Sequence, residues 1–201
     1  RSGSIGRGHR FRGAPPWAVL PLSTTHQEST MNLRAYQLAA ARTIPEGMPA
    51  ADLILNAALG LCGEAAEVLA AFLAPDPTGT ERIAELGDVL WYCAALMTAF
   101  GADLEDVVGS QDPPLTLARE WRWHSDQLIT AAGGIAELVK KHRFHGRTLH
   151  RSGILTRTVA IVGAVRGLAA HVGSDIPAVC AANVEKLRLR HPDGFRVGVS
   201  S

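Results

Sequence analysis

Two apolar stretches, LGLCGEAAEVLAAF (59–72) and ELGDVLWYC (85–93), decide how the rest of the chain is interpreted. Each is apolar at nearly every position, as a buried helix is, and each carries two acids three residues apart. Residues with that spacing lie on one face of a helix. If the two helices pack antiparallel, their acidic pairs face each other in the bundle. The four acids are Glu64, Glu67, Glu85 and Asp88.

Four facing carboxylates need compensation. Two of them about 5 Å apart repel by about 3 kcal/mol at an effective dielectric near 20. Between residues 43 and 110 the only basic side chain is Arg82, so a cation is the simplest partner. Oxygen ligands favour Mg²⁺, or Mn²⁺ in its place, over Zn²⁺. The alternative is that the acids point outward as ordinary surface charges.

The composition is that of a globular protein. The chain has 201 residues, of which 47% are hydrophobic and 19% are charged. No apolar run approaches the roughly 20 residues of a membrane span, so we expect no membrane association. The three cysteines lack CxxC spacing and fall in apolar helical patterns. They therefore indicate reduced core thiols and a cytoplasmic protein.

Charge is unevenly distributed along the sequence. Residues 1–30 carry four Arg and one Glu, residues 31–110 three basic and eleven acidic side chains, and residues 111–201 thirteen basic and seven acidic ones. An acidic first half suits cations and a basic second half suits phosphates. The alternative is that two unrelated solvated faces differ by chance.

The pattern after Met31 is helical almost throughout, which predicts an all-α bundle. Residues 1–30 are rich in Gly, Ser, Pro and Arg and indicate a disordered basic tail, with a nucleic-acid-binding arm as the alternative. Pro45, Gly101 and the QDPP turn (111–114) mark helix ends. The expected helices are 32–43, 51–73, 79–100, 103–109, 115–142, 153–172 and 175–190.

A faint internal repeat divides the chain. The order Gly-x-x-x-Glu, helix, Gly-x-Asp, helix occurs once before residue 110 and again after residue 125. We therefore expect a first repeat over 31–110, a linker and the start of the next helix over 111–124, and a second repeat over 125–201.

Three motifs in order resemble the MazG-like family of all-α nucleoside triphosphate pyrophosphohydrolases. They are the first helix LRAYQLAAART (33–43), the E-x-x-E and E-x-x-D words with 17 residues between them, and the closing segment ANVEKLRLRHPDGF (182–195). The resemblance covers about 31–109 and 125–195. It implies a MazG-like helical bundle and hydrolysis of a nucleoside triphosphate to the monophosphate and pyrophosphate.

The resemblance also implies roles for individual residues. The four acids would coordinate Mg²⁺, and the remaining candidates would hold the triphosphate. These are Asn183, Lys186 and Arg190 in the closing segment, and Lys140 and Lys141 in LVKKHRFHG (138–146). For each of these basic residues the alternative is a solvated helix face.

The chain departs from the family pattern because its first copy lacks the closing motif and its second copy has lost the acids. Gly134 aligns with Glu64, and Glu137 matches Glu67. The other two replacements are Arg157 for Glu85 and Ala160 for Asp88. We infer a fused pseudo-dimer in which the first repeat supplies the metal site and the second a basic clamp. Arg157 would then stand as a cation in the vacant metal position.

In the expected chemistry, Mg²⁺ offsets charge on the phosphates, Glu67 orients or deprotonates the attacking water, and Lys186 with Arg190 holds pyrophosphate. Trp91 and Tyr92 are candidates to stack on a base, with core packing as the alternative, and Asn56 is a candidate to bind a base edge.

Specificity and assembly stay open at this stage. Activity on dCTP or dUTP and phosphoribosyl-ATP hydrolysis are alternatives within the fold. A catalytically weak or inactive nucleotide-binding or scaffold protein, and nucleic-acid binding through the basic regions, are alternatives in other classes. The fused pair either suffices alone or pairs again as a homodimer.

Overall fold

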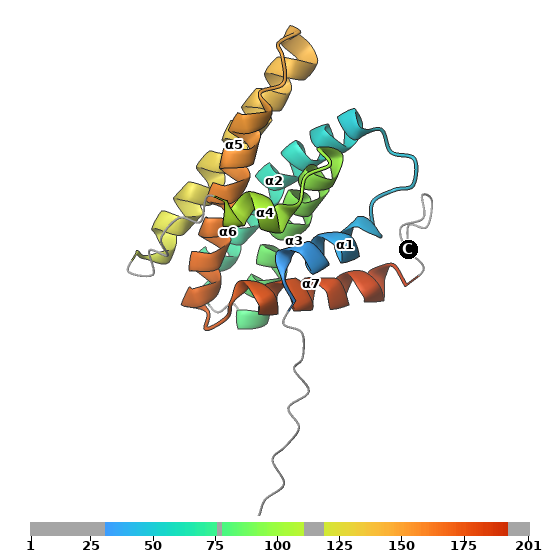
Figure 1. The fold of residues 1–201 in the computed structure, drawn as a ribbon. Helices are drawn as coiled ribbons and strands as arrows, with labels where there is room; N and C mark the ends of the chain where they lie inside the picture. Colours follow the sequence, from blue (N-terminus) through green and yellow to red (C-terminus); the bar gives the residue numbers. More distant parts are fainter. Residues whose placement is uncertain (1–30, 76–77, 111–118, 193–201) are drawn as a thin grey trace, which may run out of the picture. The chain divides into compact units, whose positions relative to one another are not determined.

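The computed structural model describes residues 31–75, 78–110 and 119–192, and these residues are helical with no strand (Figure 1). The expectation of an all-α fold is therefore confirmed. Predictions for residues 1–30 and for the QDPP turn lie outside the described residues. The seven helices in the described part of the chain are α1 (Leu33–Ala41), α2 (Ala50–Leu73), α3 (Gly79–Ala99), α4 (Leu104–Gly109), α5 (Trp121–His145), α6 (Arg151–His171) and α7 (Ile176–Arg190).

Short polar side chains begin several of these helices. Asn32, Thr78, Asp103 and Asp175 each accept a hydrogen bond from a backbone N–H in the first turn of α1, α3, α4 and α7, respectively. Such caps satisfy N–H groups that have no partner inside the helix. They explain why the predicted starts of these helices agree with the observed ones to within a residue.

The prediction was least accurate for α5. The expected helix over 115–142 begins only at Trp121 and continues to His145, where Gly146 ends it with a φ of 65°. Residues 115–118 lie outside the described residues. The polar residues His142, Arg143 and His145 favour a loop in the sequence-based prediction. In the structure they lie in the last turn of α5, where basic side chains interact favourably with the helix dipole.

Two antiparallel hairpins, α2–α3 and α5–α6, form the centre of the bundle, with α2 packed against α5. α7 crosses α3 and lies alongside α1, and the short α4 contacts α6 and α1 (Figure 1). One continuous core contains buried side chains from both hairpins, including Leu61, Leu90, Ile135 and Leu168. This packing decides the site, because it brings α7 from the end of the chain onto the acidic helix α3.

The second hairpin repeats the helix ends of the first. α3 and α6 begin at Gly79 and Arg151, 72 residues apart, and each has 21 residues. α4 and α7 begin at Leu104 and Ile176, again 72 residues apart, each after an Asp cap. The short helix that follows each hairpin packs on the other hairpin, since α4 contacts α6 and α7 contacts α3.

α2 and α6 are each long and apolar enough to cross a membrane by length and composition alone, although the sequence predicts no membrane span. Buried core helices of soluble proteins pass the same test, so the finding is weak. The absence of membrane association and the cytoplasmic location both stay predictions.

Candidate functional site

Three of the four predicted acids converge where α2 and α3 pack. Glu64 and Glu67 on α2 and Glu85 on α3 place one carboxylate oxygen each within 4.8 Å of one another. Glu64 and Glu85 are half-buried, and Glu67 is exposed. The spacing of three and the antiparallel hairpin together produce this meeting, as the sequence predicted. Carboxylate oxygens are the ligands that Mg²⁺ takes in proteins, so the donor type fits a hard cation.

The carboxylates of this site repel one another, and their pKa values show it. Burial, reinforced by Asp88, Glu67 and Glu85, raises the pKa of Glu64 to about 7. Burial and the same kind of repulsion raise the pKa of Glu85. Lys186 acts in the opposite direction on both. The cluster therefore favours any additional positive charge.

Asp88, the fourth acid, is held by α7. Its carboxylate accepts a hydrogen bond of 2.9 Å from the Asn183 side-chain amide and forms an ion pair with the Lys186 ammonium. Both residues had been expected to hold phosphate, and the structure places them directly beside the acids. Lys186 therefore supplies a positive charge to the acids in addition to any bound cation. Basic side chains near the acids in the sequence do not predict it, since it lies 98 residues after Asp88.

Tyr36 anchors this arrangement and was missed from the sequence. Its fully buried hydroxyl donates to the Asn183 side-chain oxygen at 2.8 Å and lies 3.2 Å from the Gly87 carbonyl oxygen. Burial raises its pKa well above the ordinary value, so it stays a donor. A buried Tyr hydroxyl usually has a hydrogen-bond partner, so a Tyr in the apolar first helix was the feature of the sequence that could have indicated this role.

Gly87 permits the close approach of α7. A Cβ at this position would lie 2.7 Å from the Cβ of Asn183, which is buried. Glycine immediately before Asp88 therefore lets Asn183 reach the carboxylate. A similar contact occurs at Gly60, where a Cβ would meet the Tyr92 ring at 2.2 Å.

The predicted base-binding residues have different surroundings. Trp91 donates its indole N–H to the Thr43 hydroxyl at 2.7 Å and packs edge-on against Tyr92. These contacts agree with the alternative prediction, that Trp91 and Tyr92 pack in the core and do not stack on a base. Asn56 is exposed on α2, two turns before Glu64, and Arg190 is exposed in the last turn of α7 on the side of Lys186.

Lys140 and Lys141 lie apart from the acids. Both form ion pairs with Glu137 on their own helix α5. Lys140 also lines a hollow against Leu55 and Leu59 of α2. Since Leu59 and Glu64 are separated by about 140° around the helix, Lys140 lies on a different side of α2 from the acidic cluster. The structure thus does not bring Lys140 to the proposed phosphate position, and the contact shown for Lys141 is its ion pair with Glu137.

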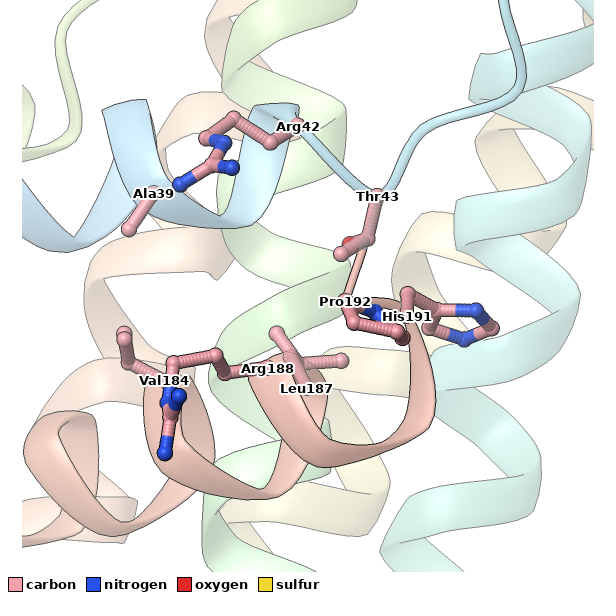
Figure 2. Close-up of a pocket in the computed structure, with 8 residues that line it drawn as sticks. All are labelled: Ala39, Arg42, Thr43, Val184, Leu187, Arg188, His191 and Pro192. Atoms are coloured by element: carbon pink, nitrogen blue, oxygen red, sulfur yellow. The ribbon is translucent and has the colours of Figure 1, made fainter. Parts of the chain in front are cut away.

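A small hollow lies between the ends of α1 and α7, beyond the Trp91–Thr43 hydrogen bond. Figure 2 shows Arg42 and Thr43 facing Leu187, Arg188 and His191 across it. None of the four predicted metal ligands lines this hollow. Arg188 is engaged by Glu185 through two hydrogen bonds. The hollow is therefore distinct from the acidic cluster.

Comparison of the chain with models of known protein families, with curated proteins and with solved structures finds no match. The resemblance to MazG-like enzymes therefore stays a hypothesis that depends on the motifs and on the geometry of the acidic site.

Proposed function

We propose that the chain is a Mg²⁺-dependent nucleoside triphosphate pyrophosphohydrolase of the MazG-like kind, which converts a ribo- or deoxynucleoside triphosphate and water into the monophosphate and pyrophosphate. One observation carries the proposal. Glu64, Glu67 and Glu85 converge within 4.8 Å, and a lysine from the far end of the chain lies on the adjacent Asp88. Acids for a divalent cation beside a base for phosphate are the parts that phosphoryl transfer needs.

Each residue has a distinct role in this mechanism. Bound at the acids, Mg²⁺, or Mn²⁺ in its place, would supply charge neutralisation and a more acidic water. Glu67, the exposed acid of the cluster, orients or deprotonates the water that attacks the α-phosphorus. Lys186 and Arg190, one turn apart on α7, hold the pyrophosphate that leaves. Asn183 and Tyr36 position Asp88.

The proposed fused pseudo-dimer is supported by the repeated helix ends and crossed contacts. In the first hairpin Glu64 meets Glu85. In the second, Arg157 lies so close to Gly134 that a Cβ there would be 2.3 Å from the Arg157 Nε. The guanidinium also donates to the Gly153 carbonyl at 2.9 Å. These contacts support the proposal that Arg157 stands between the helices of the second hairpin as a cation in the vacant metal position.

The test is product release from a panel of ribo- and deoxynucleoside triphosphates with Mg²⁺. We expect one preferred nucleotide to yield monophosphate and pyrophosphate. Glu67→Gln and Glu85→Gln should each lower kcat by about 100-fold or more. Asp52→Asn, an exposed acid on the same helix α2, serves as the matched control and should leave kcat unchanged. Turnover that survives both cluster variants would refute the proposal.

One observation favours a catalytically inactive nucleotide-binding protein instead. Lys186 and Asn183 already engage Asp88, so the fourth predicted ligand is occupied by protein groups. Under this alternative no triphosphate is hydrolysed, yet Mg²⁺-dependent nucleotide binding persists and is lost in Lys186→Met. Calorimetry with a non-hydrolysable triphosphate, with and without Mg²⁺, measures binding, and the product-release assay measures turnover. Binding without turnover of any nucleotide in the panel would assign the inactive function.

A further inference from the structure

The end of α5 and the turn that leads into α6 carry a concentration of positive charge, and we call residues 140–151 the basic tip. Five of these residues are lysine or arginine, and the sequence has no acid between Glu137 and Asp175. Figure 1 shows the tip projecting from the rest of the bundle, where α5 ends and α6 begins. Like charges gathered at one exposed end repel one another, so the tip favours a bound anion.

The protein itself neutralises little of this charge. Glu137 is shared by Lys140 and Lys141, and about half of each lysine side chain stays exposed. Arg143 and Arg147 are exposed and form no ion pair with any residue in the described part of the chain. Two guanidinium groups are therefore available to bind phosphate, whose oxygens match their fork of N–H donors.

Hydrogen bonds fix the turn that carries these groups. The Arg147 backbone N–H donates to the Lys141 carbonyl oxygen at 3.2 Å, and the His142 ring donates from Nδ1 to the Arg147 carbonyl oxygen at 2.7 Å. At the start of α6 the Arg151 guanidinium donates to the Phe100 carbonyl oxygen at 2.9 Å. The backbone of Arg147 is thus held against the last turn of α5, so a ligand need not order the turn when it binds.

An exposed aromatic ring lies among the charges of the tip. Phe144 is 68% exposed, and the Arg143 guanidinium lies 5.9 Å from the centre of its ring. Lys140 shares this face, because residues four apart are neighbours on a helix. Proteins that bind single-stranded nucleic acid combine basic side chains for the phosphates with aromatic rings on which bases stack.

Other polyanions fit the tip less well. The bases of a duplex are stacked on one another and leave nothing for an exposed ring to hold. A helix bound at a membrane surface buries a whole apolar face. Among residues 140–151, all of them described, Phe144 is the one large apolar side chain that is exposed. One ring suffices to stack on a base but is a small anchor for a membrane.

We propose that the basic tip binds single-stranded nucleic acid, with phosphates on Lys140, Arg143 and Arg147 and a base stacked on Phe144. These contacts depend on charge and on stacking, so RNA and DNA both bind and base sequence has little effect. Lys140 lies on a different side of α2 from the acidic cluster, so the tip is separate from the proposed catalytic site. The proposal does not depend on hydrolysis of a triphosphate.

Fluorescence anisotropy of labelled oligothymidylate and oligouridylate of about 20 nucleotides, titrated with the full chain, tests the proposal. We expect a Kd on the order of 10 µM at about 50 mM salt, and affinity should fall as salt rises because phosphate contacts release counterions. Binding of both oligomers supports the proposal, and a preference between them identifies the favoured strand.

Two variants separate the phosphate contacts from the stacking contact. Arg143→Gln combined with Arg147→Gln should weaken binding about tenfold or more and make the salt slope shallower by about 1.4, since each phosphate contact contributes about 0.7. Phe144→Ala should weaken binding at least about fivefold without changing the slope, because it removes stacking alone. These side chains are exposed, and Gln and Ala are good helix formers, so the fold is kept.

Arg119→Gln combined with Arg122→Gln is the matched control. Both arginines are exposed at the opposite end of α5, so the charge lost is the same while the tip is intact. The control should keep the wild-type Kd and salt slope. Absence of binding at low salt, or equal losses in the control and the tip variants, overturns the proposal.

Three further results would also overturn it. Unchanged binding in the tip variants would assign the nucleic acid to another basic segment, such as residues 1–30. Tighter binding of duplex DNA than of the single strands would contradict the stacking contact at Phe144. Binding of anionic phospholipid vesicles without binding of either oligomer would make the tip a membrane contact.

Discussion

Glu64 shows what a single residue at this site contributes to stability. Its pKa is raised to about 7 in the folded chain, above the ordinary value of 4.5. Between these pH values the folded state binds more protons than the unfolded state, so the free energy of unfolding falls as pH rises from about 4.5 to 7. Because the side chain is only half-buried, we expect a loss of about 1–2 kcal/mol after solvent screening.

Urea denaturation of the metal-free protein between pH 4.5 and 8 measures this loss. Glu64→Gln keeps the shape and cannot ionise, so its unfolding free energy should vary less over that window. Glu46→Gln, an exposed acid before α2, should retain the wild-type dependence. An unchanged slope in Glu64→Gln would mean that the cluster's repulsion is relieved by other means.

Asn183 is a second residue whose loss should be large. It is 1% exposed and links Tyr36 of α1 to Asp88 of α3. Asn183→Ala removes the hydrogen bonds to Tyr36 and Asp88 and opens a cavity, so we expect a destabilisation of about 2–4 kcal/mol by thermal or urea unfolding. Asn56→Ala, an exposed Asn on α2, should change stability by less than about 0.5 kcal/mol. Equal effects in the two variants would contradict the role assigned to Asn183.

At the scale of helices, the α5–α6 contact contains an unsatisfied histidine. His124 is 2% exposed, and neither of its ring nitrogens has a hydrogen-bond partner. The ring lies against Gly167, where a Cβ would come within 2.1 Å of it. Burial, and then His171, lowers the His124 pKa below 6.5. Protonation therefore occurs first in the unfolded chain, and stability should fall as pH decreases through about 6.5.

His124→Leu tests whether the buried His124 ring makes stability depend on pH. The variant removes two buried polar atoms at similar volume, so it should raise the free energy of unfolding at pH 7 and flatten its decline between pH 7 and 5. His145→Leu, an exposed histidine at the end of α5, should leave that decline unchanged. A steeper decline in His124→Leu would show that the neutral ring stabilises the contact.

Helix positions were largely predictable because their signals are local. Asp103 and Asp175 cap α4 and α7, and Gly101 ends α3 with a φ of 60°. These residues act on the turn next to them, so the sequence suffices. The start of α5 was not predictable in the same way, because Glu120 at its N-cap makes no side-chain hydrogen bond there.

At the scale of the whole molecule, the two halves of the chain complete each other. α2 packs on α5, α3 on α6 and α7, and α1 on α7. Residues 31–110 alone would therefore expose the apolar faces that these contacts bury. We expect that piece to show no cooperative thermal transition by circular dichroism, and mixing it with residues 119–201 to restore one. Cooperative unfolding of the isolated piece would show that the first half is independent.

The sequence by itself determined the all-α class, most helix ends and the placing of Glu64 with Glu67, and of Glu85 with Asp88, on one face of a helix, because helical spacing and capping act over a few residues. The meeting of the two pairs depends on how α2 packs against α3. Only the tertiary structure decided that Lys186 and Asn183 lie on Asp88, that Tyr36 anchors them, and that Lys140 lies elsewhere. Those contacts depend on how α7 crosses α3. That crossing is set by packing of whole helix faces, including the space that Gly87 leaves, and local spacing does not encode it.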